Sequence, residues 1–347
     1  MTLSGNSMKR YFDPQYYHRE LYKTTERQLA FRKGTAFLKW KYALLRKLKD
    51  LTGYEEPEKK PLKITWGEAK EFPSYTRKRL VFNSEENSDI PAYLLIPKSV
   101  KGKMPAMVCL QGHTTGFHLS AGITRYPGDA GAISGGRDFA VQAALNGFVG
   151  LAIEQRCFGE RRLTLQKYMC DHPCTDAALH SFMLGKTMIA ERVQDARRAI
   201  DLLETLDFVD KKRIGCVGNS GGGTISFYLG IFDKRIKLAV PSCTYCTFKE
   251  SLMSIWHCVD NYIPGILKYA EMGDLAGLRA PKKLLIVAGK RDKIFPLTGV
   301  KKAYRTTEKI FSAAGAKNNL KLLIGSKGHQ FYPEQAWPLI KEMINSD

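Results

Sequence analysis

No stretch of the sequence is both apolar enough and long enough to span a membrane. Residues 1–12 contain no apolar core like that of a secretion signal. Internal repeats and low-complexity tracts are also absent. We therefore expect a globular protein that resides in the cytoplasm and has no membrane partner.

Acidic residues are scarce, with 34 Asp and Glu against 54 Lys and Arg and a formal net charge of +20. Such an excess can attract nucleic acid, an anionic surface or an acidic substrate. The positive charge is spread along the chain, however, and no nucleic-acid-binding motif interleaves basic and aromatic residues. We favour a Lys-rich enzyme without a nucleic-acid partner, and leave open whether the charge serves an acidic partner.

A disulfide framework is not expected for the eight cysteines of this 347-residue chain, because no secretion signal accompanies them. Some neighbouring residues nevertheless have the chemistry of metal ligands, namely Cys170-x-His172-x-Cys174, Cys243-x-x-Cys246 and His257-Cys258. These groups are far apart in the sequence and lie in different loop contexts, unlike the paired knuckles of structural zinc motifs. We predict reduced thiols, no metal and no cofactor.

The chain divides by composition near residue 60. Residues 1–60 are aromatic, basic and helical in period, with a helix end near Thr52-Gly53, and residues 55–61 (EEPEKKP) are typical of an exposed linker. We predict a helical N-terminal extension over residues 1–60 and a catalytic domain over residues 61–347. The extension either packs on that domain or joins a second subunit, which would make a homo-oligomer.

From residue 62 onward, short apolar runs alternate with helical segments. Residues 77–84 and 90–97 are predicted to form an antiparallel pair, and residues 136–147 and 177–206 to be helical, the latter as one long helix or a bent pair. Continuous apolar runs of this kind are typical of parallel strands buried on both faces. They cover residues 105–112, 148–155, 213–220, 236–243, 282–289 and 320–327. This pattern predicts an α/β protein with a doubly wound, mostly parallel sheet.

The residues Gly218-Asn219-Ser220-Gly221-Gly222 match the pattern G-x-S-x-G. The motif directly follows a predicted strand and precedes a predicted helix, which is the setting that a nucleophile elbow requires. The alternative is a glycine-rich phosphate loop, but the Lys of a P-loop and the spacing of a dinucleotide loop are both missing. We therefore predict that Ser220 is a nucleophile and that the N–H of Gly221 stabilises an oxyanion.

An acid and a histidine should follow such a serine, each beyond the carboxyl end of a strand. Asp292 follows the predicted strand 282–289, and His329 follows the predicted strand 320–327. We predict that His329 is the general base and that Asp292 orients it. Asp260 and Asp274 are rival acids, for which a solvated or capping role is the alternative that we favour.

A second oxyanion donor is expected in the loop after the strand 105–112, from the N–H of His113 or Thr114. The side chain of His113 either faces the substrate or hydrogen-bonds within its loop. We expect Arg156 to contact substrate, or else to pair with a nearby carboxylate and brace its own loop. Residues 243–280 are expected to form a partial cap over the site, with His257 and Tyr262 as substrate contacts.

Taken together, these segments resemble the α/β-hydrolase superfamily, and more narrowly the branch of dienelactone hydrolases and acetyl-xylan-esterase-related enzymes. The resemblance extends over residues 75–340. It is carried by GNSGGG, GKRDKIFP, GSKGHQFYP, EQRCFGER and the long segment NYIPGILKYAEMGDLAGLRAPKKLLIVAGKRD. It implies a cofactor-free carboxylic ester hydrolase with the triad Ser220, Asp292 and His329. The chain departs from dienelactone hydrolases in having serine where they have cysteine, and its oxyanion loop reads QGH.

The function that we predict is cleavage of a small-molecule carboxylic ester, such as an acetylated sugar, through an acyl-enzyme. One alternative is a serine peptidase of the prolyl-oligopeptidase type, which shares the elbow. That family adds a large propeller domain, for which the residues before the sheet leave no room. The other alternative is a non-catalytic basic binding protein on a hydrolase fold, against which the complete triad argues.

Overall fold

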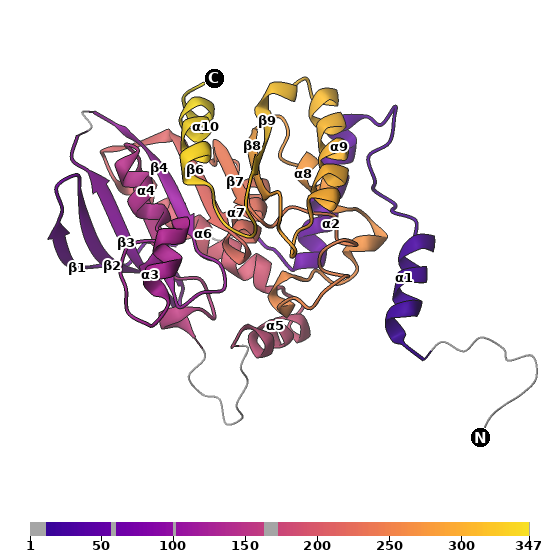
Figure 1. Ribbon diagram of the computed structural model, residues 1–347, viewed down its shortest axis with the longest axis horizontal. Helices are drawn as coiled ribbons and strands as arrows, with labels where there is room; N and C mark the ends of the chain where they lie inside the picture. The colour runs from indigo at the N-terminus through magenta and orange to yellow at the C-terminus, as the bar shows by residue number, and fades with distance from the viewer. Residues whose placement is uncertain (1–11, 57–59, 100–101, 163–172, 347) are drawn as a thin grey trace, which may run out of the picture.

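One mixed sheet runs through the whole molecule in a computed structural model, which describes residues 12–56, 60–99, 102–162 and 173–346 (Figure 1). The strand order is β1-β2-β3-β5-β4-β6-β7-β8-β9. The strands are β1 (Ile64–Glu71), β2 (Tyr75–Glu85), β3 (Ser88–Pro97), β4 (Met104–Leu110), β5 (Val149–Ile153), β6 (Val209–Asn219), β7 (Leu238–Ser242), β8 (Lys283–Gly289) and β9 (Leu320–Gly325).

The strands β5, β4, β6, β7, β8 and β9 are parallel to one another, whereas β1, β2 and β3 pair antiparallel with their neighbours. Every residue of β5, β7 and β8 is buried, because helices cover both faces of the parallel part. The predicted α/β class and the predicted antiparallel opening pair are therefore confirmed. The edge strand β1 was not predicted, because its sequence ITWGEAKE is mostly polar and all but its first residue are exposed.

Most of the described helices pack in two layers against the sheet. Those described are α1 (Pro14–Thr24), α2 (Phe37–Thr52), α3 (Asp129–Ala132), α4 (Phe139–Leu145), α5 (Pro173–Met183), α6 (Met188–Thr205), α7 (Gly221–Phe232), α8 (Met272–Gly277), α9 (Leu297–Ala313) and α10 (Pro333–Asn345). One core lies between the sheet and α4 and α10. The larger core, on the other face, holds side chains of α2, α6, α7, α8 and α9.

The predicted helical segment 177–206 is a bent pair. The helix α5 ends at Met183, and Gly185 then takes a left-handed conformation with φ of 72°. Thr187 starts α6 as its N-cap, since its side chain accepts the N–H of Ala190 at 3.2 Å. The bend leaves α6 packed along the sheet while α5 lies near the segment that precedes α8 (Figure 1).

The two N-terminal helices behave differently. The helix α2 buries Trp40, Leu44 and Leu48 in the larger core and ends at Gly53, whose φ of 64° is that of a left-handed cap. The predicted helix end is thus confirmed. The helix α1 has no buried residue and lies at the periphery of the molecule (Figure 1), where His18, Leu21 and Tyr22 line a pocket with residues of the segment before α8. Part of the predicted linker, residues 57–59, lies outside the described residues.

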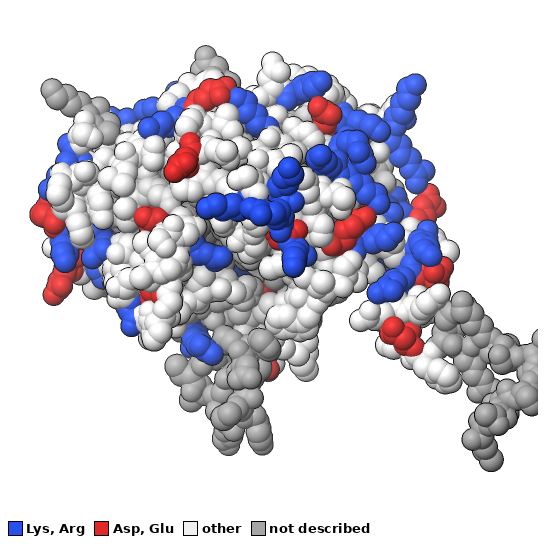
Figure 2. Space-filling view, in the orientation of Figure 1, with Lys and Arg blue, Asp and Glu red and all other residues white. Residues whose placement is uncertain are grey.

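No described helix combines the length and apolarity needed to cross a membrane. Figure 2 shows one face of the molecule, on which Lys and Arg outnumber Asp and Glu and the two signs are interspersed. The basic residues are spread across this face, with more of them over the half that carries α9 (Figures 1 and 2).

Candidate active site

Ser220 occupies a sharp turn between the end of β6 and the start of α7. Its φ of 57° and ψ of −125° are strained for a residue with a side chain. The turn is tight enough that a Cβ atom on Gly222 would collide with the carbonyl oxygens of Leu110 and Gln111. The glycines of the motif are therefore needed to bring Ser220 to the edge of the sheet, as in a nucleophile elbow.

His329 and Asp292 lie beyond the carboxyl ends of the neighbouring strands β9 and β8. His329 Nδ1 is 2.8 Å from Asp292 Oδ2. Burial opposes ionisation of Asp292, but the hydrogen bond and the charge of His329, together with two backbone N–H groups, hold the pKa of this carboxyl below its usual value. Asp292 is therefore an ionised acceptor that fixes the orientation of the imidazole.

Among the hydrogen bonds of the described residues, none joins Ser220 Oγ to His329. Ser220 is nonetheless anchored by its backbone, since its N–H donates to the carbonyl of Ser242 at 2.9 Å. Catalytic hydrogen bonds are often long in the absence of substrate and shorten when it binds. The structure thus brings Asp292 and His329 together and anchors the backbone of Ser220.

The loop after β4 lies directly against the elbow. A Cβ atom on Gly112 would come within 2.7 Å of the carbonyl oxygen of Asn219 and 3.1 Å of Ser220 Cβ, so only glycine allows this approach. Gly221 is the first residue of α7, and a first-turn N–H has no acceptor within its helix. The N–H of His113 also has no acceptor in the part of the chain that the structure describes. Both groups are thus available to an oxyanion.

A buried glutamate, Glu154, connects the loop after β4 to the loop after β5. Its carboxyl group accepts hydrogen bonds from Gln111 Nε2 at 2.6 Å, from the N–H of Phe117 at 3.2 Å and from the N–H of Glu160 at 3.0 Å. Burial raises its pKa to about 8, against the effect of these donors. Sequence reasoning missed this residue, although its place at a strand end, within EQRCFGER, was a usable signal.

A cavity of about 730 Å³ opens above the elbow. Its lining includes Ser220, Gly221, His113, His257 and Phe295. His257 Nε2 is buried and has no hydrogen-bond partner among the described residues. Burial, together with the nearby rings of His329 and His113, lowers the pKa of His257, so this ring is neutral at pH 7.

Two predicted substrate contacts lie elsewhere. The Arg156 guanidinium is paired with Asp195 and Glu191, each at 3.0 Å, and with Glu85 at 2.7 Å, and it does not line the cavity. These contacts agree with the bracing role rather than with substrate binding. Tyr262 also points away, since its hydroxyl donates to the carbonyl of Leu252 at 2.9 Å and its ring lines a separate pocket beside α1.

The two rival acids have other partners. Asp274 forms the capping box of α8 and accepts the N–H of Phe31 at 2.9 Å, as its predicted capping role requires. Asp260 is neither solvated nor a cap. It is buried between Arg192, at 2.6 Å, and His113 Nε2, at 3.1 Å. Burial and the charge of Arg192 oppose protonation of His113, but its hydrogen bonds with Asp260 and Cys174 and the charge of Asp260 raise its pKa to about 9.

The cysteine groups singled out in the sequence separate in space. Cys243 lies beside Asp292 and His329, whereas Cys246 is turned toward the carbonyl of Pro296. Cys258 lies near Cys174, with His113 and Asp260, but His257 does not join them. Cys170 and His172 lie outside the described residues. The spacing of these residues in the sequence therefore did not predict which of their side chains lie close together.

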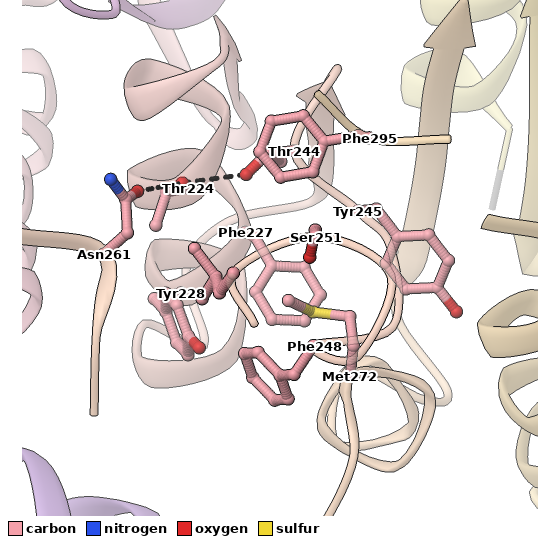
Figure 3. Close-up of a pocket in the computed structure, with 11 residues that line it drawn as sticks. Thr224, Phe227, Tyr228, Thr244, Tyr245, Phe248, Ser251, Asn261, Met272 and Phe295 are labelled. Atoms are coloured by element: carbon pink, nitrogen blue, oxygen red, sulfur yellow. Dashed lines mark hydrogen bonds between the residues drawn. The ribbon is translucent and has the colours of Figure 1, made fainter. Parts of the chain in front are cut away.

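A second and much smaller cavity, of about 20 Å³, lies beside α7 (Figure 3). Figure 3 shows Thr224 between Thr244 and Asn261, to which its hydroxyl is hydrogen-bonded at 2.8 and 3.1 Å. The other walls are mainly aromatic. Asn261 and Phe295 line both cavities, so the two cavities are neighbours.

The mostly parallel sheet, the strained Ser220 after β6 and the hydrogen-bonded pair Asp292 and His329 beyond β8 and β9 are arranged as in the α/β-hydrolase fold. Residues 2–312 match the Abhydrolase family, and the chain belongs to that family. A relative in Bacillus subtilis strain 168, the provisionally named hydrolase YtaP, is 24% identical over 277 residues, which are 79% of this chain and 89% of the relative.

Solved structures share the fold at low sequence identity. A provisionally assigned acetyl xylan esterase, BF1801 of Bacteroides fragilis NCTC 9343, has a TM-score of 0.78 and 15% identity, with 97% of this chain and 96% of that chain covered. A glucuronoyl esterase from Solibacter usitatus has a TM-score of 0.66 and 14% identity, with 91% and 97% covered. An acetyl xylan esterase from Paenibacillus sp. R4 has a TM-score of 0.58 and 18% identity, with 94% and 98% covered.

Proposed function

We propose that this hydrolase is a serine esterase that cleaves carboxylic esters of sugars, with Ser220, His329 and Asp292 as its triad. The observation that carries the proposal is the 2.8 Å hydrogen bond between His329 and Asp292, which lie beyond the carboxyl ends of β9 and β8 in the same sheet in which β6 leads to the strained Ser220. A carboxylate that orients a histidine at the same edge of the sheet as a strained serine supports nucleophilic acyl transfer.

The reaction proceeds in two steps. His329 accepts the proton of Ser220 while Oγ forms a bond to the ester carbonyl carbon, and the carbonyl oxygen becomes an oxyanion. The N–H groups of Gly221 and His113 stabilise this charge. The intermediate collapses to an acyl-enzyme as His329 returns the proton to the departing alcohol. Water then repeats the sequence, with His329 as base, and releases the carboxylic acid and free Ser220.

The mouth of the large cavity favours a sugar as the alcohol. Tyr126 and Trp256 line it and are 55% and 67% exposed, so their rings offer apolar faces to a bulky ligand. His257 Nε2, buried and without a partner in the described part of the chain, can bind a hydroxyl group. Three structural neighbours are named as esterases of acetyl xylan or glucuronoyl groups, in agreement with this substrate class.

The small cavity favours a short acyl group. Its volume of about 20 Å³ is close to that of a single water-sized or methyl-sized group. Its aromatic walls and its position next to Thr224, one turn after the nucleophile, suit an acetyl methyl (Figure 3). We include acetyl transfer to water in the proposal for this reason.

The proposal is tested with a set of esters and one amide series. We expect hydrolysis of acetylated xylose and of p-nitrophenyl acetate, a fall in kcat/KM of at least about tenfold for the butyrate ester, and no cleavage of peptidyl amides. Ser220→Ala should abolish every activity. Preferred cleavage of peptidyl amides would instead support the peptidase, and an inactive but folded wild type would support a binding protein.

Neither alternative is favoured at present. The described residues form a single sheet with its helices and include no second β domain of the kind that prolyl-oligopeptidase-like enzymes carry. The location in the cytoplasm and the association of two chains through the N-terminal extension stay predictions.

A further inference from the structure

Four side chains with metal-binding chemistry meet in the wall of the large cavity. His113 comes from the oxyanion loop, Cys174 from the first turn of α5, and Cys258 and Asp260 from the segment before α8. One ligand atom from each lies within 4.8 Å of all the others. Three of the four are buried, and His113 is partly open to the cavity. Residues distant in the sequence thus converge on one point.

We propose that His113, Cys174, Cys258 and Asp260 bind one zinc ion. An imidazole, two thiolates and a carboxylate form a tetrahedral set of the type that Zn²⁺ prefers over calcium or magnesium. Zinc bonds of about 2.0–2.3 Å place neighbouring ligand atoms roughly 3.3–3.8 Å apart. His113 Nε2 and Asp260 Oδ2 are 3.1 Å apart, close to this separation, and all four ligand atoms lie within 4.8 Å of one another.

The surroundings of the four ligands fit an ion of charge +2. Arg192 is 2% exposed and donates to Asp260 Oδ2 at 2.6 Å and to Cys174 Sγ at 3.5 Å. Two thiolates and one carboxylate carry three negative charges, which Zn²⁺ and Arg192 together neutralise. Without the ion, the buried cluster cannot hold both cysteines as thiolates at acceptable cost. A buried arginine among the ligands is thus explained by the charge that the ligands carry.

The same surroundings orient the ligands. The Arg192 guanidinium stacks over the Phe158 ring at 4.3 Å, and the His113 ring packs edge-on against Phe158 at 4.9 Å. Hydrogen bonds and packing behind the ligands are a regular feature of metal sites. Here they restrain Asp260 and His113 from two sides.

A disulfide between Cys174 and Cys258 is the competing explanation. It would account for the closeness of the two sulfur atoms, but not for the convergence of His113 and Asp260 on the same point. Both cysteines are free thiols in the structure. Zinc accounts for all four residues, and we therefore favour it.

The ion would have a structural role, because four protein ligands leave no open position for substrate. It would fasten the oxyanion loop, α5 and the segment before α8 to one another. His113 Nδ1 lies close to Gly221, where a Cβ atom would be only 3.1 Å away. The site thus holds the loop that supplies an oxyanion donor against the helix that supplies the other. It does not rest on the proposed esterase function.

The test is the metal content of the full-length chain, purified without a metal-affinity step and measured by inductively coupled plasma mass spectrometry. We expect one zinc per chain in the wild type and in Ser220→Ala. The double variant Cys174→Ser, Cys258→Ser should contain at least about tenfold less zinc per chain than the wild type. Cys246→Ser is the matched control, since Cys246 is also buried but contacts Pro296 instead, and it should keep its zinc.

A second test uses only the wild type, so that a folding defect in the cysteine variants cannot affect its result. Removal of zinc with a chelator and addition of Co²⁺ should give the near-ultraviolet absorption of thiolate-to-cobalt charge transfer. The proposal is overturned if the wild type contains no zinc and gives no such band. It is also overturned if the intact mass and a thiol titration show a Cys174–Cys258 disulfide, or if the double variant keeps its zinc. If Ser220→Ala is inactive but still contains zinc, the zinc site is shown independently of the proposed esterase function.

Discussion

Asp292 holds His329 with one carboxylate oxygen and is itself held by the other. Oδ2 lies 2.8 Å from His329 Nδ1, while Oδ1 accepts the backbone N–H groups of Ile294 at 2.8 Å and Phe295 at 3.1 Å. Because the carboxyl group is fixed at both oxygens, the imidazole has one preferred orientation. The ring nitrogen that Asp292 leaves free is then Nε2, the atom that a general base for Ser220 needs.

Replacement of Asp292 by Asn should lower kcat about a thousandfold or more, with little change in KM. The amide keeps the contacts of Oδ1, but it cannot stabilise the imidazolium and favours the wrong tautomer of His329. The measurement is steady-state hydrolysis of p-nitrophenyl acetate. A matching circular dichroism spectrum is the control for folding, and a decrease of less than tenfold would show that Asp292 is not the orienting acid.

Replacement of Gly112 by Ala should lower kcat roughly a hundredfold, because the new methyl group forces the oxyanion loop away from Ser220 and Gly221. Gly131→Ala is the matched control, since a Cβ atom there would meet nothing within 4 Å. Rates with p-nitrophenyl acetate and melting temperatures should be compared for both variants. Equal rates would contradict the close approach of this loop to the elbow.

Glu154 should make the stability of the protein fall as the pH rises. Its pKa is raised to about 8 in the folded chain by burial, whereas an unfolded glutamate ionises near about 4.3. Below both values the carboxyl group is neutral in both states. Between them only the unfolded state releases the proton, so the free energy of unfolding decreases by up to a few kcal/mol until about pH 8.

Urea unfolding of the wild type and Glu154→Gln at pH 5 and pH 8 measures this effect. The variant cannot ionise, and its stability relative to the wild type should therefore be greater at pH 8 than at pH 5. A difference between the two proteins that is the same at both pH values would mean that the three donors around Glu154 keep it ionised throughout.

Trp40→Ala should destabilise the protein by about 3–5 kcal/mol. Trp40 is 5% exposed in the larger core, and its Nε1 donates to the carbonyl of Leu29 at 2.8 Å. Tyr42, on the same helix and 70% exposed, is the matched control, and Tyr42→Ala should change stability by less than about 0.5 kcal/mol. Chemical denaturation measures both. Similar small effects would indicate that residues 12–52 are a separable extension rather than part of the core.

Strand ends were predictable from the sequence wherever apolar runs were continuous. The runs before Ser220 and Asp292 end in fully buried residues, so that hydrophobicity locates them and the polar residue that follows each. The run before His329 forms the edge strand β9, which is only partly buried but still mostly apolar. The edge strand β1 could not be found in this way, because exposed edge positions place little demand on side-chain hydrophobicity.

Contacts between loops were the part that the sequence could not predict. Arg156 and Tyr262 have the chemistry of substrate contacts, but their direction depends on Asp195 and on Leu252, which lie elsewhere in the chain. The closeness of His113, Cys174, Cys258 and Asp260 likewise depends on how three loops fold over the sheet. The spacing of residues along the chain does not predict contacts between side chains on different loops.

Covalent labelling of Ser220 tests the central claim most directly. The wild type is treated with a fluorophosphonate, digested and analysed by tandem mass spectrometry, with Ser220→Ala in parallel. We predict one adduct on Ser220 together with complete loss of esterase activity, and neither label nor activity in the variant. An adduct on another residue, or hydrolysis by Ser220→Ala at the rate of the wild type, would contradict the account.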